Sequence, residues 1–226
     1  DAKRNEIRLM QLQGDRVIDN VDSLSDETAS IISTWKDIDG TFWLGTISHG
    51  LYHFDPLAFT TKHFAYSIAD TASLSGNHVL SIHDDPFEPA RYLWVGTEGG
   101  GVNKMEKQTG KFRRITQKHG LPDNVVYAIL VDKHGNLWMS TNQGICRMDP
   151  RSLAFRNYDV SDGLRIMEFN REEYYQDEDG KMYFGNVGGI NIFHPDDITD
   201  NPHVPRIVLT DFKLRNVPVS VRDSGS

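Results

Sequence analysis

The side chains that could carry chemistry in this chain are scattered rather than grouped. Nine histidines are present, but no pair stands at a local metal-ligand spacing. The sequence contains no HExxH helix, no GxSxG turn and no calcium-loop pattern. The glycines at 99–101 are followed by neither a helix nor a lysine suited to binding phosphate. We therefore expect no catalytic residue, no metal and no cofactor here.

Composition excludes further classes of protein. Asp84-Asp85 and Asp196-Asp197 could bind a divalent cation, but capping of strands and turns is the simpler interpretation. The single cysteine, Cys146, excludes an internal disulfide and a cysteine-rich metal site. A formal net charge of −8 with scattered basic residues argues against nucleic-acid binding. No stretch approaches the ~20 apolar residues of a membrane-spanning helix.

A motif repeated four times organises the whole chain. The copies read DGTFWLGT at 39–46, YLWVGTEG at 92–99, HGNLWMST at 134–141 and EDGKMYFGN at 178–186. Their aromatic anchors are Trp43, Trp94, Trp138 and Tyr183, so the intervals are 51, 44 and 45 residues. This period is typical of propeller blades. The sequence therefore predicts an all-β fold, a β-propeller of four-stranded antiparallel blades, with the four anchors as buried structural residues.

The repeat also predicts where the blades and their strands lie. Short β-prone runs that precede the anchors, at 31–37, 79–84, 126–132 and 171–177, are expected to be first strands around a central axis. Because both ends of the sequence look cut, we expect about four blades of a larger, seven-bladed ring. The expected boundaries are a partial blade at 1–20, repeats at about 21–66, 67–116, 117–158 and 159–200, and a linker with the first strands of another domain at 201–226.

Two stretches resemble a known family. The unit SLSGNHVLSIHDD…LWVGTEGGGVNKM at 73–105 and the run GLPDNVVYAILVDKHGNLWMSTNQGICRMDP at 120–150 resemble the two-component regulator propeller repeat. The segments at 155–170 and 188–214 are similar to the last blade of such a propeller and its exit into an Ig-like triple-tyrosine domain. Two departures stand out, because Ser140 replaces a Gly of the repeat and Tyr183 replaces a Trp.

The resemblance implies a context for the chain. Such propellers form the ligand-sensing, periplasmic part of bacterial membrane receptors whose output is a histidine kinase or, in some relatives, a diguanylate cyclase. The implied ligand is a small molecule or an oligosaccharide. The implied partners are the remaining blades, the Ig-like domain and, in the full receptor, a second copy of the chain. The resemblance implies that this chain itself is not an enzyme.

Blade topology indicates which residues could bind a ligand. In an up-and-down blade, the loops that leave the second and fourth strands lie on one face, and here they are polar and amide-rich. Such side chains suit hydroxyl-bearing ligands. The candidates are His49, Asn77, Glu98, Asn124, Asn142, Gln143, Asn170, Arg171 and Asn186.

Two other functions remain open at this point. Lyases that act on cyclic peptide antibiotics use a similar propeller with a catalytic histidine and a metal, and fold alone does not exclude this. Only His49 and Glu98 are candidates for such a cluster. The other alternative is a protein-interaction platform that dimerises receptors.

Overall fold

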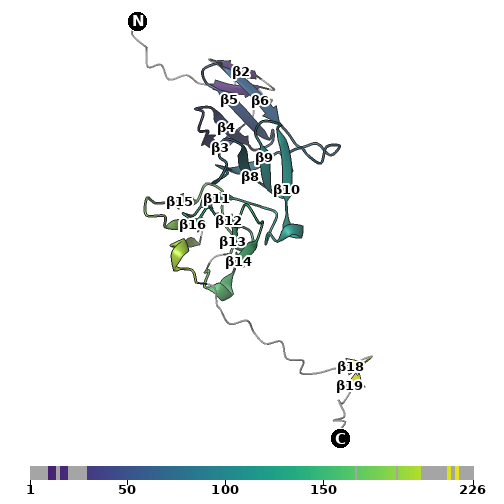
Figure 1. The fold of residues 1–226 in the computed structure, drawn as a ribbon, viewed down its shortest axis with the longest axis vertical. Helices are drawn as coiled ribbons and strands as arrows, with labels where there is room; N and C mark the ends of the chain where they lie inside the picture. The colour runs from purple at the N-terminus through teal and green to yellow at the C-terminus, as the bar shows by residue number, and fades with distance from the viewer. Residues whose placement is uncertain are drawn as a thin grey trace. The chain divides into compact units, whose positions relative to one another are not determined.

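The computed structural model describes residues 10–13, 16–19, 30–165, 167–186, 188–199, 213–214 and 217–218. Side chains are described at 30–165, 167–186 and 188–199. This part of the chain is all-β, and antiparallel sheets follow one another along the sequence (Figure 1). Its helical content is three short 3₁₀ turns, at Gln117–His119, Val160–Asp162 and Pro195–Asp197. The predicted β-propeller class is confirmed.

The four repeats form four consecutive blades. The first contains β3 (Ile31–Lys36), β4 (Phe42–Thr46), β5 (Leu51–Asp55) and β6 (Thr60–Phe64). The second contains β7 (Val79–Asp84), β8 (Tyr92–Thr97), β9 (Gly101–Glu106) and β10 (Lys111–Ile115). The third contains β11 (Ala128–Val131), β12 (Leu137–Thr141), β13 (Gly144–Met148) and β14 (Phe155–Tyr158). The fourth contains β15 (Tyr174–Gln176), β16 (Met182–Asn186) and β17 (Gly189–Phe193).

The first strands of the blades are neighbours, as the repeat predicts. β3 contacts β7, β7 contacts β11, and β11 contacts β15. β11 and β15 begin two or three residues later than expected. Val126 instead donates its N–H to the carbonyl of Thr97 in the preceding blade, at 3.1 Å, and Glu172 adopts a positive φ of 65°. The chain before β15 is therefore a turn rather than a strand.

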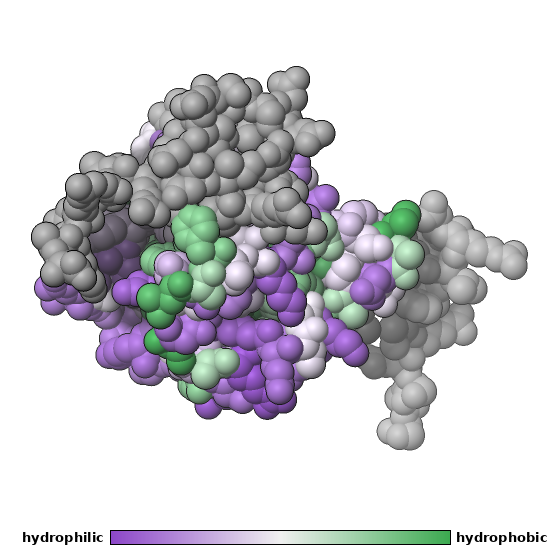
Figure 2. All heavy atoms as spheres, turned by 90° about the horizontal axis from the view of Figure 1, so that it is seen from above, coloured by the Kyte–Doolittle hydropathy of each residue, from purple (hydrophilic) through white to green (hydrophobic). Residues whose placement is uncertain are grey.

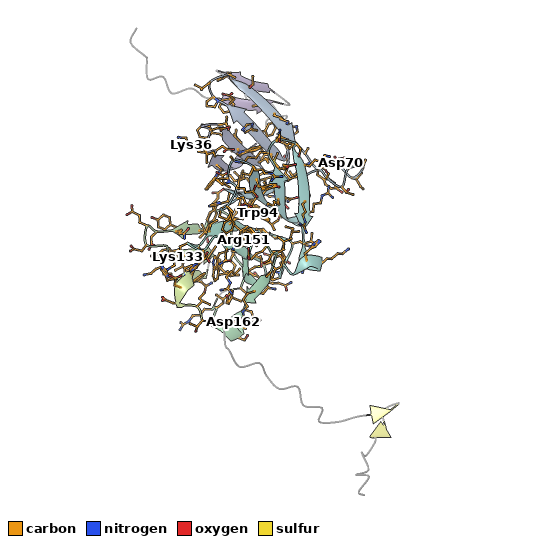
Figure 3. The ribbon with its side chains drawn as sticks, viewed as in Figure 1. Lys36, Asp70, Trp94, Lys133, Arg151 and Asp162 are labelled. Carbon is orange, nitrogen blue, oxygen red and sulfur yellow. The ribbon has the colours of Figure 1, made fainter. Side chains whose placement is uncertain are left out.

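The three tryptophan anchors pack against the blade that follows each of them. Trp43 is 2% exposed and clusters with Val79, Ile82 and Leu93 of the second blade. Trp94 is fully buried against the third blade. Figure 3 labels Trp94 among the densely packed side chains of the blades. These large aromatic bodies supply much of the apolar area that holds adjacent sheets together.

Trp138 and Tyr183 extend this comparison of the anchors to the last two blades. Trp138 is 1% exposed, and its ring lies 5.1 Å from that of Phe193 in the fourth blade. Tyr183 occupies the equivalent position in the fourth blade and is only partly buried. The sequence predicts a buried residue here. The difference follows from the packing, because no blade among the described residues comes after the fourth to cover this ring.

Inner strands approach closely because a glycine faces a serine. Ser33 lies opposite Gly45 and donates its hydroxyl to Val79 O of the next blade at 3.1 Å. A Cβ on Gly45 would lie 2.1 Å from Ser33 Oγ, so only glycine fits. In the third blade Ala128 lies opposite Ser140. In the third blade the serine therefore lies on the second strand and the small residue on the first strand, the reverse of the arrangement in the first blade.

Segments outside the four blades are described in part. β1 (Met10–Gln13) and β2 (Arg16–Asp19) form an antiparallel hairpin within 1–20, where a partial blade is expected. One compact unit runs from Asp1 to Pro195, and a second runs from Asp196 to Ser226. The second contains a short hairpin of β18 (Lys213–Leu214) and β19 (Val217–Pro218). Most of the linker and of the first strands expected at 201–226 lies outside the described residues.

Candidate ligand-binding pocket

A pocket of about 340 Å³ lies where the inner strands of three consecutive blades begin. Pockets of this size accommodate small ligands. Its wall comes from the loops before β7 and β15, the loop after β8, and the residues around the start of β11. The lining residues are His78, Leu80, Glu98, Tyr127, Asn170, Arg171 and Glu173. All of them belong to the compact unit that contains the blades.

His78 and Glu98 form a pair across the second blade. Nδ1 of His78 contacts Oε2 of Glu98, and Glu98 N–H donates to His78 O at 3.0 Å. Nε2 of His78 is buried and has no hydrogen-bond partner among the residues that the structure describes. A buried imidazole nitrogen without a partner costs free energy unless water or a ligand satisfies it. This atom therefore points to a binding role for the pocket.

Tyr127 gives the pocket a hydroxyl with a fixed proton. Its OH donates to Oδ1 of Asn142 at 2.9 Å. Burial, followed by the nearby carboxylates of Glu98 and Asp123, raises the pKa of Tyr127 above its usual value. The hydroxyl therefore stays protonated, and its oxygen keeps lone pairs that a ligand can use.

The segment before β15 carries the charged wall of the pocket. Nδ2 of Asn170 donates to Oε1 of Glu173 at 3.3 Å. Arg171 forms no hydrogen bond or ion pair with any side chain or backbone group in the described part of the chain. An exposed guanidinium that is not used by the fold is available to a ligand.

These charged residues depart from the repeat. In register, Arg171 stands where the second and third blades have Val79 and Val126, both fully buried. Glu173 stands opposite Gly185, at the position that Ser81 occupies opposite Gly96. Between them, Glu172 holds a φ of 65°, a conformation that non-glycine residues rarely adopt. Local departures of this kind concentrate at functional sites.

Topology predicted part of this pocket. Glu98, Asn170 and Arg171 are brought together in its wall, and Asn142 joins them through Tyr127. His78 lies between β6 and β7, in a loop that leaves a fourth strand, and such loops were expected on this face. Tyr127 and Glu173 were missed, because both fall within the predicted first strands at 126–132 and 171–177, whereas the candidates were chosen from the loops. The charged run at 171–173, at positions where other blades have Val and small residues, was the available signal.

The side chains of the candidates Asn77 and Asn124 form hydrogen bonds that stabilise loops. Oδ1 of Asn77 accepts the N–H of Tyr66 at 2.7 Å, and Oδ1 of Asn124 accepts the N–H of Gln117 at 2.9 Å. Neither asparagine lines the pocket. Their equivalent bonds in two successive blades indicate a structural part of the repeat.

The remaining three candidates also lie outside the pocket wall. His49 is half-buried in the turn before β5, where its N–H donates to Thr46 Oγ1 at 3.0 Å. Gln143 is exposed in the turn before β13. Asn186 fastens the segment before β15, because its Nδ2 donates to Glu168 O.

Among the described residues, one group of side chains has metal-ligand geometry, and it lies outside the pocket described above. Ligand atoms of Asp37, Asp39 and His53 lie within 4.8 Å of one another. The Lys107 ammonium already binds Asp37 Oδ2 and Asp84 Oδ1, each at 2.7 Å. This lysine bridges the first two blades and supplies a positive charge beside the group. The lyase hypothesis places its metal with His49 and Glu98, and neither residue belongs to this cluster.

The fold and the pocket define a β-propeller with a polar pocket at the beginning of its inner strands. Residues 120–143 match the family model described as two component regulator propeller. This segment of the third blade is thus a repeat of the two-component regulator propeller type. Among the described residues, no helix has the length and apolarity needed to cross a membrane.

One curated relative is similar to this chain in sequence, and two solved structures are similar to it in fold. Histidine kinase P4 of Formosa agariphila is 32% identical over 184 residues, which are 79% of this chain and 13% of the relative. An extracellular domain from B. thetaiotaomicron described as part of a hybrid two component system, BT3049, aligns with a TM-score of 0.66 and 22% identity. That alignment covers 96% of this chain and 32% of the other. The extracellular domain of BT4673 from the same organism gives a TM-score of 0.64 and 21% identity over 80% of this chain and 25% of the other.

Proposed function

We propose that this chain is part of the ligand-sensing, extracytoplasmic propeller of a bacterial two-component receptor. The observation that carries the proposal is the pocket wall that contains Nε2 of His78 and the guanidinium of Arg171, neither of which has a partner among the described residues. The kinship with a histidine kinase supports a kinase as the output of the parent protein. The solved relatives, which are extracellular domains, support a periplasmic location.

The proposed ligand is an oligosaccharide. Sugars present many hydroxyl groups, which donate and accept hydrogen bonds at short spacing, and the pocket wall offers matching polar groups. The wall also contains the apolar side chain of Leu80 and the ring of Tyr127. A mixed surface of this kind suits the polar edge and the apolar face of a sugar ring.

The proposed partners are other parts of the same receptor. The chain spans 13% of its curated relative and about a third or less of the solved relatives, which supports further blades beyond those described. We propose that the four blades belong to a larger, seven-bladed ring and that residues 201–226 lead into an Ig-like domain. A homodimer of the full receptor is the expected signalling unit.

Binding measurements on variants test the proposal. The full chain is applied to an array of plant and algal oligosaccharides, and positive probes are titrated calorimetrically. Arg171→Ala should weaken binding at least ~10-fold, which corresponds to about 1.4 kcal/mol. The matched control is Arg113→Ala, because Arg113 is exposed on the outer strand β10 and does not line the pocket. Binding that is unaffected by Arg171→Ala and by His78→Ala would refute the site, and turnover of a probe would favour a lyase.

A further inference from the structure

We infer that this pocket selects uncharged, hydroxyl-rich sugars and discriminates against acidic ones. The inference rests on the proposed function and deepens it by naming the class of sugar. Some polar atoms of the wall form hydrogen bonds within the protein. The inference follows from which of the remaining atoms can donate and which can accept.

His78 contributes an acceptor. Its Nδ1 contacts the carboxylate of Glu98, and an ionised carboxylate can only accept hydrogen bonds. In the neutral imidazole the proton therefore lies on Nδ1, which leaves the lone pair on Nε2. That nitrogen is buried and unpartnered among the described residues, so it requires a donor from a ligand or from water. Glu98 thus acts as a positioning residue for His78.

Three more groups in the wall also accept. The hydroxyl proton of Tyr127 is used on Asn142, so its oxygen offers only lone pairs to the pocket. The amide group of Asn170 donates to Glu173, and the carboxylate of Glu173 is itself an acceptor. Arg171 keeps all of its donors unused by the described residues, and the Asn170 amide keeps its second N–H. The remaining groups of the wall accept, so a ligand must also bring donors, and hydroxyl groups do both.

The charges of the wall lead to the same conclusion. Two carboxylates, Glu98 and Glu173, face the pocket together with one guanidinium, Arg171. The two carboxylates outnumber the single guanidinium. A uronic acid or sulfated sugar would pair with Arg171 but would be repelled by both carboxylates, and like charges at close range disfavour binding. A neutral sugar satisfies the same acceptors without this cost.

Matched pairs of probes test the inference. The full chain is titrated with tetrasaccharides of β-1,4-glucan, galactan and mannan, each paired with its counterpart oxidised to a uronic acid at C6. For any scaffold that binds, the neutral member should bind at least ~10-fold more tightly than the acidic member. Glu173→Gln removes one negative charge and keeps the shape, so it should narrow this ratio. Glu172→Gln is the control, because Glu172 is the exposed neighbour and does not line the pocket.

The outcomes separate the inference from the proposed function. Tighter binding of the acidic members to the wild-type chain would overturn the inference and leave a sugar-binding pocket in place. An unchanged ratio in Glu173→Gln would also overturn it. If no member of any pair binds in a way that depends on Arg171, the proposed function itself fails and the inference fails with it.

Discussion

The indole Nε1 of Trp138 donates a hydrogen bond of 2.9 Å to Oδ2 of Asp132 at the end of the first strand of its blade. The other carboxylate oxygen of Asp132 accepts the backbone N–H groups of His134 and Asn136, each at 2.9 Å. One aspartate therefore ties the first hairpin turn to the buried anchor. The same bond recurs as Trp43–Asp37 at 2.7 Å, Trp94–Asp85 at 3.0 Å and Tyr183–Asp177 at 3.1 Å.

Removal of this carboxylate should destabilise the third blade more than the fourth. Asp132→Ala leaves the buried indole N–H of Trp138 without a partner, at a cost of about 1–3 kcal/mol. Asp177→Ala should cost less, because Tyr183 is only partly buried and its hydroxyl can bond to water. Urea denaturation measures both values, and Asp132→Asn, which keeps an acceptor oxygen, is the control. Equal losses in the two alanine variants would contradict this account of the anchor.

The exchanged pair Ala128 and Ser140 should behave as a unit. In the second blade a Cβ on Gly96 would lie 2.4 Å from Ser81 Oγ, so a serine opposite a serine is crowded. Ala128→Ser alone should therefore destabilise the protein. The double variant Ala128→Ser/Ser140→Gly restores the serine–glycine pairing of the first two blades. Its loss of unfolding free energy should be smaller than the sum of the single losses by at least ~0.5 kcal/mol, and simple additivity would show that the pair is not coupled.

His83 should make stability depend on acidity. Burial against Trp35, whose ring centroid is 4.3 Å away, lowers the pKa of His83 below 6.5, although Asp84 partly opposes the shift. The unfolded chain therefore takes up the proton at higher pH than the folded chain. The stability contribution is complete above about pH 6.5 and is lost as the pH falls through the lower folded pKa.

The matching experiment compares unfolding free energies at about pH 5 and pH 7.5. His83→Phe keeps an aromatic ring beside Trp35 and should flatten the difference between the two values. His119→Gln is the control, because His119 is exposed in a short 3₁₀ turn. The unfolding free energy of both variants should still depend somewhat on pH, since burial lowers the pKa of His53 as well. If the difference in unfolding free energy between the two pH values is unchanged in His83→Phe, His83 is not the source of the pH dependence.

The sequence predicted the strands well because each blade repeats the same constraints. The anchors, the tight turns and the glycine–aliphatic starts recur in register, so one motif fixes four sheets. Individual ligand contacts do not recur in this way. Asn77 and Glu98 lie in polar loops on the same face of the blades, yet one accepts a backbone N–H and the other pairs with His78. That difference depends on atomic distances across a hairpin, which no spacing pattern encodes.

The outer face of the fourth blade is unusually apolar. Tyr175 is 61% exposed, and Ile190 and Ile192 are each 53% exposed. Residues equivalent to Ile190 in the other blades are fully or almost fully buried, and they are Leu51, Val102 and Ile145. Strand pairing places Tyr175, Tyr183 and Ile192 side by side. In the space-filling view of Figure 2, green apolar groups lie among the mostly purple, hydrophilic residues that the structure describes.

This face should make the isolated chain self-associate. Exposed apolar area costs roughly 25 cal/mol per Å², and a soluble monomer tolerates only limited contiguous patches. Analytical ultracentrifugation should show oligomers at micromolar concentration for the wild-type chain. Ile190→Lys should shift the distribution towards monomer, because it puts a charge on the face that other blades bury. Leu57→Lys is the control, since Leu57 is 97% exposed in the turn between β5 and β6 and lies on another blade. If the wild-type chain stays monomeric, this face does not mediate self-association. The same follows if Leu57→Lys dissociates as readily as Ile190→Lys. A monomer with a covered face would further indicate a ring that closes with the blades described here.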